Sequence, residues 1–502
     1  MRTFRLAPLL LLATLLPIFV RGGDAPATPA TVAAGARPPR LFPDYADVVL
    51  PPNIAPLNFR IEEPGKRYEA QLHSTFGPPV VVRSKDGTIQ FPLAEWRRLV
   101  RTNAGHPLRL DVAVEDAGGA WTHFLTVTNQ IAREPVDSHL AYRLLKPLYS
   151  LYSTIGLYQR DLETFQQRPL VENRHTGNGC LNCHTFLNRQ PDTFAFHTRT
   201  NGPVHPMVLV VSNEPVRVDK TMGYLSWHPS GRLLTFSANK LTLFYHTHGG
   251  DTRDVFDAKS HLGIYRVDSN TVVLPPVLSP TNRNLTWPSW APDGRHLYFC
   301  STPRRPLEEF REVRYDLVRV PYDLERDQWG EPETLVAAQD TGLSAAQPRV
   351  SPDGRFVLFT LCKFGNFPIY RPTSDLYLLD LTTRRWRRLD INSSQADSWH
   401  CWSSNGRWVV FSSKRLDGLF ARPFFSYVDT EGNFHKPFLL PQEDPEFYDT
   451  CLQTFNLPDF VTGPVKLSEA DLARAVTRPA KVRVPATPAG GSAGSSQPAG
   501  MK

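Results

Sequence analysis

A turn-forming unit recurs four times in the C-terminal half of this 502-residue chain and limits the folds that the chain can adopt. Each unit ends in Gly-Arg after a short run of turn-forming residues. The units are residues 227–232, 290–295, 350–355 and 402–407. Their glycines, Gly231, Gly294, Gly354 and Gly406, are spaced by 63, 60 and 52 residues. Repeats of this length indicate a β-propeller or another repeat array.

Each unit supplies the residues that a tight turn between two strands requires. Pro-Asp-Gly or Ser-Asn-Gly places turn formers before a glycine that accepts a positive φ angle. Apolar runs follow the turns at 233–236, 296–299, 356–359 and 408–411. Further apolar runs follow at 264–267, 317–320, 376–379 and 425–428. With a weaker fourth run, such as 387–389, each unit predicts one blade of four antiparallel strands that packs on the next blade.

The Ser-Pro-Asp-Gly-Arg pattern followed by a strand resembles the WD-like repeats of TolB-type β-propellers. The likeness covers about half of the chain and implies a propeller of five or six blades over residues 204–465. Strand-like residues at 206–211 and 447–460 are expected to close the ring by pairing early and late parts of the chain. Two units depart from the pattern, with His228 in place of Ala or Ser and Ser404 in place of Pro. Because the repeated residues build turns, the resemblance implies a fold and no activity.

Cys180-Leu-Asn-Cys183-His184 is the attachment signature of a c-type haem. We expect Cys180 and Cys183 to form thioethers with the two vinyl groups of one haem, and His184 to be the proximal iron ligand. An exported chain that combines this motif with such repeats resembles the haem-binding TolB-like proteins of bacteria. That resemblance implies a periplasmic monohaem cytochrome and does not supply a substrate. No catalytic residue is predicted.

Two other chemistries fit the cysteine pair less well. A zinc site needs four ligands, and the sequence has no second Cys-x-x-Cys and no suitably spaced histidine pair. A thioredoxin-like pair lies near a βαβ pattern, whereas residues 178–179 and 188–191 are typical of loops. A disulfide or redox pair and a zinc site therefore stay as alternatives.

Several side chains near the motif are candidates for the sixth iron ligand. His197 and Met207 are the main candidates, and His175 and His205 are also close in sequence. A methionine ligand would raise the reduction potential relative to a second histidine, and an empty position would admit a small molecule. Met207 also begins the apolar run 207–211, which is the pattern of a core strand.

The N-terminal residues predict export. Arg2 and Arg5 precede an apolar run over 6–20, and a plausible cleavage site lies at 25–27. We therefore expect a signal peptide over 1–27, an Ala- and Pro-rich linker over 28–56, and a periplasmic protein. The apolar run is short for a membrane span, so the mature chain is expected to have none.

The remaining segments complete the expected architecture, which is mainly β. Alternating apolar residues, such as those at 108–114, predict a small β-sandwich-like domain over 57–130. Leucines at helical spacing within 137–167 predict one or two amphipathic helices in a helical haem segment over 131–203. These helices are expected to cover the haem or to pack on the neighbouring domain. Residues 466–502 are expected to hold a short helix capped by Ser468 and a disordered tail.

The charge composition of the chain limits the classes of partner that it is expected to bind. The formal net charge of +7 suits an acidic partner, but export argues against nucleic acid, so we expect a redox or scaffold protein partner. One haem and no second redox motif favour single-electron transfer. A haem enzyme with substrate at the propeller mouth, or a TolB-like scaffold with a structural or sensory haem, are the alternatives. The sequence does not choose a disulfide pairing among Cys300, Cys362, Cys401 and Cys451.

Overall fold

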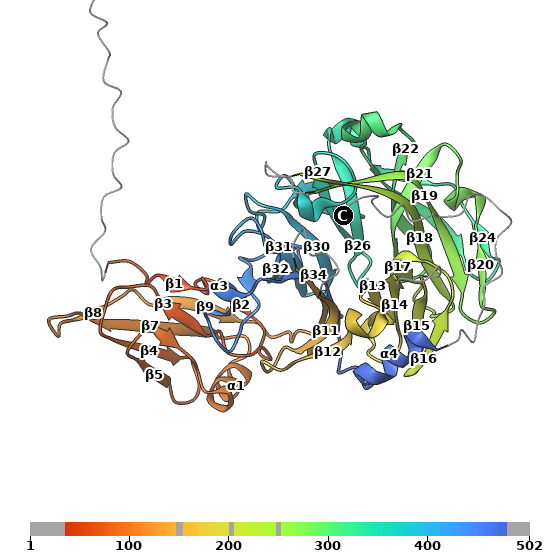
Figure 1. The fold of residues 1–502 in the computed structure, drawn as a ribbon. Coiled ribbons are helices and arrows are strands. Elements are labelled where there is room, and N and C mark those ends of the chain that lie inside the picture. The colour runs from red at the N-terminus through yellow and green to blue at the C-terminus, as the bar shows by residue number, and fades with distance from the viewer. Residues whose placement is uncertain (1–35, 147–153, 200–204, 247–252, 479–502) are drawn as a thin grey trace, which may run out of the picture.

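The computed structural model describes residues 36–146, 154–199, 205–246 and 253–478, except the side chain of Cys183. The chain is mainly β, as the sequence predicted, and forms a β-propeller with a smaller domain beside it (Figure 1). The expected signal peptide, the other residues before 36 and the tail after 478 lie outside the described residues.

Six antiparallel sheets form the propeller blades within the described residues. Blade one contains β12 (Gln167–Glu172), β11 (Ile155–Asp161), β10 (His139–Leu145) and β34 (Thr454–Val461). Blade two contains β13 (Cys180–Phe186), β14 (Phe194–Arg199), β15 (Met207–Val211) and β16 (Glu214–Val218). Blade three contains β17 (Gly223–Trp227), β18 (Leu233–Tyr245), β19 (Arg253–Arg266) and β20 (Thr271–Val273).

The four repeat units recognised in the sequence supply blades three to six. Blade four contains β21 (Arg283–Trp290), β22 (His296–Pro303), β23 (Asp316–Asp323), β24 (Gln328–Trp329) and β25 (Glu333–Val336). Blade five contains β26 (Ser344–Val350), β27 (Phe356–Cys362), β28 (Asp375–Asp380) and β29 (Trp386–Arg388). Blade six contains β30 (Asp397–Trp402), β31 (Trp408–Ser413), β32 (Arg422–Tyr427) and β33 (Phe438–Leu439).

Blade one is assembled from two distant parts of the chain. Strand β34 pairs antiparallel with β10, so that Thr454 lies opposite Leu145 and Val461 lies opposite His139. The innermost strands β34, β13, β17, β21, β26 and β30 contact one another in turn, and β30 contacts β34 to complete the ring. Early and late chain do pair, as expected. The early partner is residues 139–145, so the propeller begins well before residue 204.

The helical haem segment expected over 131–203 is wrong in its described parts. Strands β10 to β14 occupy it, with only the short 3-10 turns Asn173–Thr176 and Leu187–Arg189 between them. Six of the seven residues of β10 are buried, because β10 lies between β11 and β34 and is covered on both faces. A strand that is buried on both faces gives a nearly continuous apolar run, which periodicity does not distinguish from a helix.

The N-terminal domain contains two sheets and one helix. The larger sheet contains β2 (Val49–Leu50), β9 (Val127–Ile131), β7 (Pro107–Glu115), β4 (Arg67–His73), β5 (Val80–Ser84) and β8 (Trp121–His123). The smaller contains β1 (Leu41–Phe42), β3 (Phe59–Ile61) and β6 (Thr88–Ile89). Alternate residues of β7, among them Leu108 and Leu110, are buried as their pattern predicted.

Two features of this domain differ from the sequence expectation. Residues 41–56 are not a linker, because Tyr45 and Val48 are buried in the domain core beside β1 and β2. Helix α1 (Leu93–Thr102) was not predicted, although its buried residues Trp96, Leu99 and Val100 have helical spacing. The segment is short, and the strands around it dominate the pattern.

The N-terminal domain shares a hydrophobic core with blades five and six and with β34. The Tyr45 hydroxyl donates a hydrogen bond to the Leu439 carbonyl at 3.3 Å, and the Asn58 amide donates to the Glu443 carbonyl at 2.9 Å. The shared core fixes the domain against the ring.

The described residues of the second half of the chain contain three α-helices: α2 (Ala338–Thr341), α3 (Phe447–Thr450) and α4 (Glu469–Thr477). The capping box that Ser468 predicted is present, with Asp471 as its partner, and α4 packs on β12, β15 and β16. Among the described residues, no helix is both long and apolar enough to cross a bilayer. Cys300, Cys401 and Cys451 are free thiols in the structure, and the Cys362 thiol donates a hydrogen bond to the Phe364 carbonyl at 3.4 Å.

Candidate functional site

The innermost strand of every blade carries a bulge at the same level of the ring. In five blades the register shift includes a non-glycine residue with φ between 46° and 57°. These residues are Tyr224, Trp287, Gln347, Trp399 and Leu457. A bulge bends its strand and redirects the side chain of the extra residue, and strained backbone of this kind gathers at functional sites.

The sixth bulge falls within the Cys-x-x-Cys-His motif. The ladder between β13 and β14 shifts between Asn182 and Thr185, so Cys183 and His184 are the bulged residues. Cys183 therefore occupies the backbone position that Tyr224 and Trp399 occupy in their blades. The motif lies on the innermost strand, where all six blades meet.

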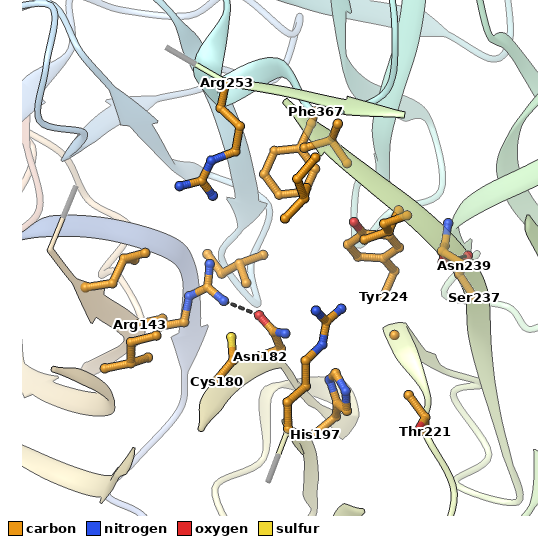
Figure 2. A pocket seen from close by; sticks show the side chains of 18 of the residues that line it. Arg143, Cys180, Asn182, His197, Thr221, Tyr224, Ser237, Asn239, Arg253 and Phe367 are labelled. Atoms are coloured by element: carbon orange, nitrogen blue, oxygen red, sulfur yellow. Dashed lines mark hydrogen bonds between the residues drawn. The ribbon is translucent and has the colours of Figure 1, made fainter. Parts of the chain in front are cut away.

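A central cavity opens beside this strand, and its walls come from blades one, two, three, five and six (Figure 2). The space left between protein atoms, with its open mouth included, is about 1110 Å³. Cys180 and Asn182, which are alternate residues of β13, both line the cavity.

Aromatic side chains cover much of the cavity wall. Tyr224, Phe367, Tyr370 and Trp399 line the space directly. Behind them, the Trp287 ring centroid lies 3.8 Å from that of Tyr224 and 5.1 Å from that of Trp399. Aliphatic residues complete this wall: Leu145, Ile155, Leu241, Leu243, Val255 and Leu457. A flat, largely apolar ligand would therefore find close contacts here.

His197 is the histidine of the cavity wall. It lies opposite Asn182 in the β13–β14 ladder and is only 2% exposed. Neither of its ring nitrogens has a hydrogen-bond partner among the described residues. Burial lowers the pKa of His197 to about 3, and the neighbouring charge of Arg199 acts in the same direction. The ring is therefore neutral at pH 7 and has an unused lone pair, which is the form that binds a metal.

His184, the motif histidine, is also buried but is not among the residues that line the cavity. Its Nε2 lies 3.7 Å from a carboxylate oxygen of Asp459 in β34, and neither ring nitrogen has a described hydrogen bond. Burial lowers the pKa of His184, and Asp459 opposes this effect. In the extended strand, Cys180 thus lines the cavity, whereas His184 lies beside Asp459 of β34. Ligation by His184 to a haem in this cavity requires a change in the backbone of the bulge.

The structure separates the other candidate iron ligands. Met207 pairs with His197 across the β14–β15 ladder but is fully buried in an apolar cluster with Met222 and Trp227, away from the cavity wall. His175 lies 3.0 Å from Glu469 on the outside of the ring. His205 also does not line the cavity. Of the four candidate ligands, only His197 lines the cavity.

The histidines and aspartates of the blade-three insertion do not form a metal site in the described residues. His246 lies 2.9 Å from Asp254, and Asp254 also pairs with Arg371. No group of three metal-ligating side chains occurs in the described ranges. His248 and Asp251 lie outside them.

The sequence analysis missed the arginines and aromatic residues of the cavity. Arg143, Arg199 and Arg253 come from three different strands, and no local pattern links them. The bulge residues did leave a signal, because Tyr224, Trp287 and Trp399 each precede a tryptophan by three residues. Cys183 likewise precedes Phe186 by three residues. An extended repeat would have aligned the haem motif with the blades.

The donor set suits a haem in its chemistry. The thiol of Cys180 lies on the wall of a cavity with aromatic sides, and the buried imidazole of His197 on the neighbouring strand has no hydrogen-bond partner among the described residues. A buried polar atom without a partner is costly, and metal ligation removes that cost. Cys180, His197 and the aromatic wall therefore fit the group that the motif predicts, whereas His184 fits it only after the change in the bulge described above.

Comparison with known proteins adds only to the description of the fold. No protein-family model and no curated protein sequence matches this chain. Among solved structures, the Galerina marginata prolyl oligopeptidase B aligns at 10% identity and a TM-score of 0.35, over 61% of this chain and 49% of that enzyme. The chain thus spans about half the length of that enzyme. The Dos1 propeller aligns at 13% identity and a TM-score of 0.32, over 54% and 64% of the two chains. A nidogen–laminin complex gives 8% identity and a TM-score of 0.37, over 64% and 98%.

Proposed function

We propose that this protein is an exported monohaem c-type cytochrome built on a TolB-like propeller. Cys180 and Cys183 would hold the haem covalently, and His184 would be the proximal iron ligand. The observation that carries the proposal is the place of the motif. It lies on an innermost strand, and its first thiol shares a cavity with His197, a buried imidazole without a hydrogen-bond partner in the described residues.

The cavity residues would each have a distinct part in such a protein. His197 would supply a second ligand to the iron, because it lines the cavity and is neutral at pH 7. Tyr224, Phe367 and Trp399 would pack against the bound group and exclude water from it. When bound, the haem supplies one-electron oxidation and reduction at its iron.

The expected signal peptide places the protein in the bacterial periplasm, where c-type haems are attached. A single haem and the absence of a second redox motif in the sequence favour transfer of one electron to or from a protein partner. The net charge of +7 suits a partner with an acidic surface.

A haem enzyme is the second candidate, and the polar lining of the cavity favours it. Thr221, Ser237 and Asn239 line one side of the cavity and could donate hydrogen bonds to a bound substrate. In that case His197 would not ligate the iron and would instead face a bound substrate. A six-coordinate low-spin spectrum supports the cytochrome, whereas a high-spin spectrum that changes on addition of cyanide supports the enzyme.

The test is covalent haem attachment. The full chain is produced with the bacterial cytochrome c maturation machinery, and the denatured protein is assayed for bound porphyrin by haem staining and pyridine haemochrome spectroscopy. We expect one haem per chain, lost when Cys180 and Cys183 are both replaced by serine. Cys451→Ser is the matched control, since Cys451 is a free thiol outside the cavity. Absence of covalent porphyrin from the unmodified chain overturns the proposal.

A further inference from the structure

We infer that the arginines of the central cavity bind the carboxylate groups of a flat, largely apolar ligand. If the ligand is haem, this inference rests on the proposed function, and the carboxylates are the two propionates of the haem. A free aromatic carboxylate is the other source of the same chemistry, and the experiment below separates the two.

Arg143 carries the argument. It extends from β10 into the cavity and is only 7% exposed (Figure 2). One terminal nitrogen donates to the Leu181 carbonyl at 3.1 Å and to the side-chain oxygen of Asn182. Its Nε has no hydrogen-bond partner, and no carboxylate pairs with it among the described residues. A buried guanidinium without a counter-charge is strongly unfavourable, so an anion in the cavity would relieve a real cost.

Two further arginines line the same space. Arg199, at the end of β14, has no ion pair among the described side chains. Arg253, from β19, enters from the opposite side, where its guanidinium lies 5.0 Å and 4.7 Å from the ring centroids of Tyr245 and Tyr370 (Figure 2). Tyr370 also accepts a hydrogen bond from Arg253 at 3.0 Å. The aromatic contacts hold this guanidinium in place, which suits bidentate recognition of a carboxylate.

No aspartate or glutamate is among the described residues that line the cavity. Asp257 lies behind the wall, where it accepts hydrogen bonds from the neutral side chains of Asn239, Tyr315 and Asn366. Asp254 pairs with Arg371 and His246 rather than facing the cavity. The described lining of the cavity thus contains no carboxylate, and Arg143 and Arg199 have no ion pair among the described side chains, so a ligand carboxylate would supply the negative charge.

The first arm of the test asks whether the carboxylates belong to haem. The full chain carrying Cys180→Ala and Cys183→Ala is titrated with haem and with haem dimethyl ester, and binding is followed by Soret absorbance. We expect haem to bind at least about tenfold more tightly than the ester, as loss of a charge-assisted hydrogen bond implies. Arg143→Gln and Arg199→Gln should each reduce this preference. Arg385→Gln, an exposed residue between β28 and β29, is the matched control and should retain it.

The second arm uses no haem. The chain without cofactor is titrated calorimetrically with terephthalate and with the neutral terephthalamide. If haem and its ester bind equally but terephthalate binds in an Arg143-dependent manner, the carboxylate is that of a free ligand. If neither acid is preferred over its neutral analogue, the inference is overturned.

The two proposals fail in different ways. Lack of covalent porphyrin in the unmodified chain overturns the cytochrome proposal. The terephthalate titration would then still show whether the cavity arginines bind a carboxylate. Covalent haem with no acid preference ends the arginine inference alone. Because Arg143→Gln alters a buried residue, circular dichroism is recorded for each variant. Arg199→Gln, at a half-exposed position, gives an independent reading should Arg143→Gln unfold the chain.

Discussion

Cys180 and Arg199 lie directly opposite each other in the β13–β14 ladder, and both line the central cavity. Opposed residues of an antiparallel pair emerge on the same face of the sheet, with Cβ atoms about 5 Å apart. The first thiol of the haem motif and a guanidinium are therefore neighbours by the pairing of two strands. His197 lies two residues before Arg199, so one strand brings an imidazole and a cation to the same wall.

The proposed ligation of the haem iron by His197 gives a spectroscopic prediction. In the haem-loaded protein, His197→Gly should convert a low-spin spectrum to a high-spin one without loss of the covalent haem, because the variant removes a ligand and leaves both thiols. Added imidazole should restore the low-spin form. Met207→Leu should leave the spectrum unchanged, since Met207 packs in the apolar core. An unaltered spectrum in His197→Gly would assign the sixth position elsewhere.

Because β34 closes the ring, truncation of one of its core side chains should strongly lower the stability of the protein. Phe460 is fully buried in this strand, and its ring centroid lies 5.8 Å from that of Phe425. Phe460→Ala should lower the free energy of unfolding by about 3–5 kcal/mol, measured by urea denaturation. Leu452→Ala, at a side chain that is 66% exposed, should change it by less than about 0.5 kcal/mol. Equal effects would contradict the role of β34 as the closing strand.

Asp257 predicts a pH-dependent stability difference. Burial raises its pKa from 3.8 to about 6, so between these values the folded protein holds a proton that the unfolded chain has lost. Its contribution to stability is therefore greatest below pH 4 and falls by about 3 kcal/mol as the pH rises through 6. Asp257→Asn should lack this fall. Urea titrations of both proteins at pH 4, 5, 6 and 7 would measure it, and parallel curves would show that Asp257 does not titrate as inferred.

A buried ion pair fixes the far end of the long β18–β19 hairpin, where Asp254 lies opposite Phe244. The side chains of Asp254 and Arg371 are 2% and 4% exposed, and they join blade three to the segment between β27 and β28. Asp254→Asn should destabilise the protein by about 3–5 kcal/mol, because it leaves a buried guanidinium without its main counter-charge. Hydrogen exchange of residues 253–257 should increase. The exposed pair Arg305–Glu309 offers a control, and Glu309→Gln should have almost no effect.

The local parts of this fold could be predicted from the sequence, and the non-local parts could not. The four turn glycines adopt φ between 69° and 74°, and the capping box of α4 is present, because both depend on residues adjacent in the chain. The pairing of 139–145 with 454–461 depends on contacts across most of the chain. For the same reason, local pattern revealed Cys180, whereas Arg143 and Arg253, which share its cavity, were found only in the structure.

Blade one contains strands from early and late parts of the chain, so it can be completed only after the last strand has been synthesised. Residues 454–461 are made about 270 residues after the Cys-x-x-Cys-His strand. Until they are made, β10 and β13 lack the neighbour that covers them, and, if the motif binds haem as proposed, the attachment machinery would meet an open sheet rather than a closed ring. A cofactor loaded at that stage would be enclosed when the last strand docks. Strand β34, which closes the propeller ring, would thus also close the central cavity over its cofactor.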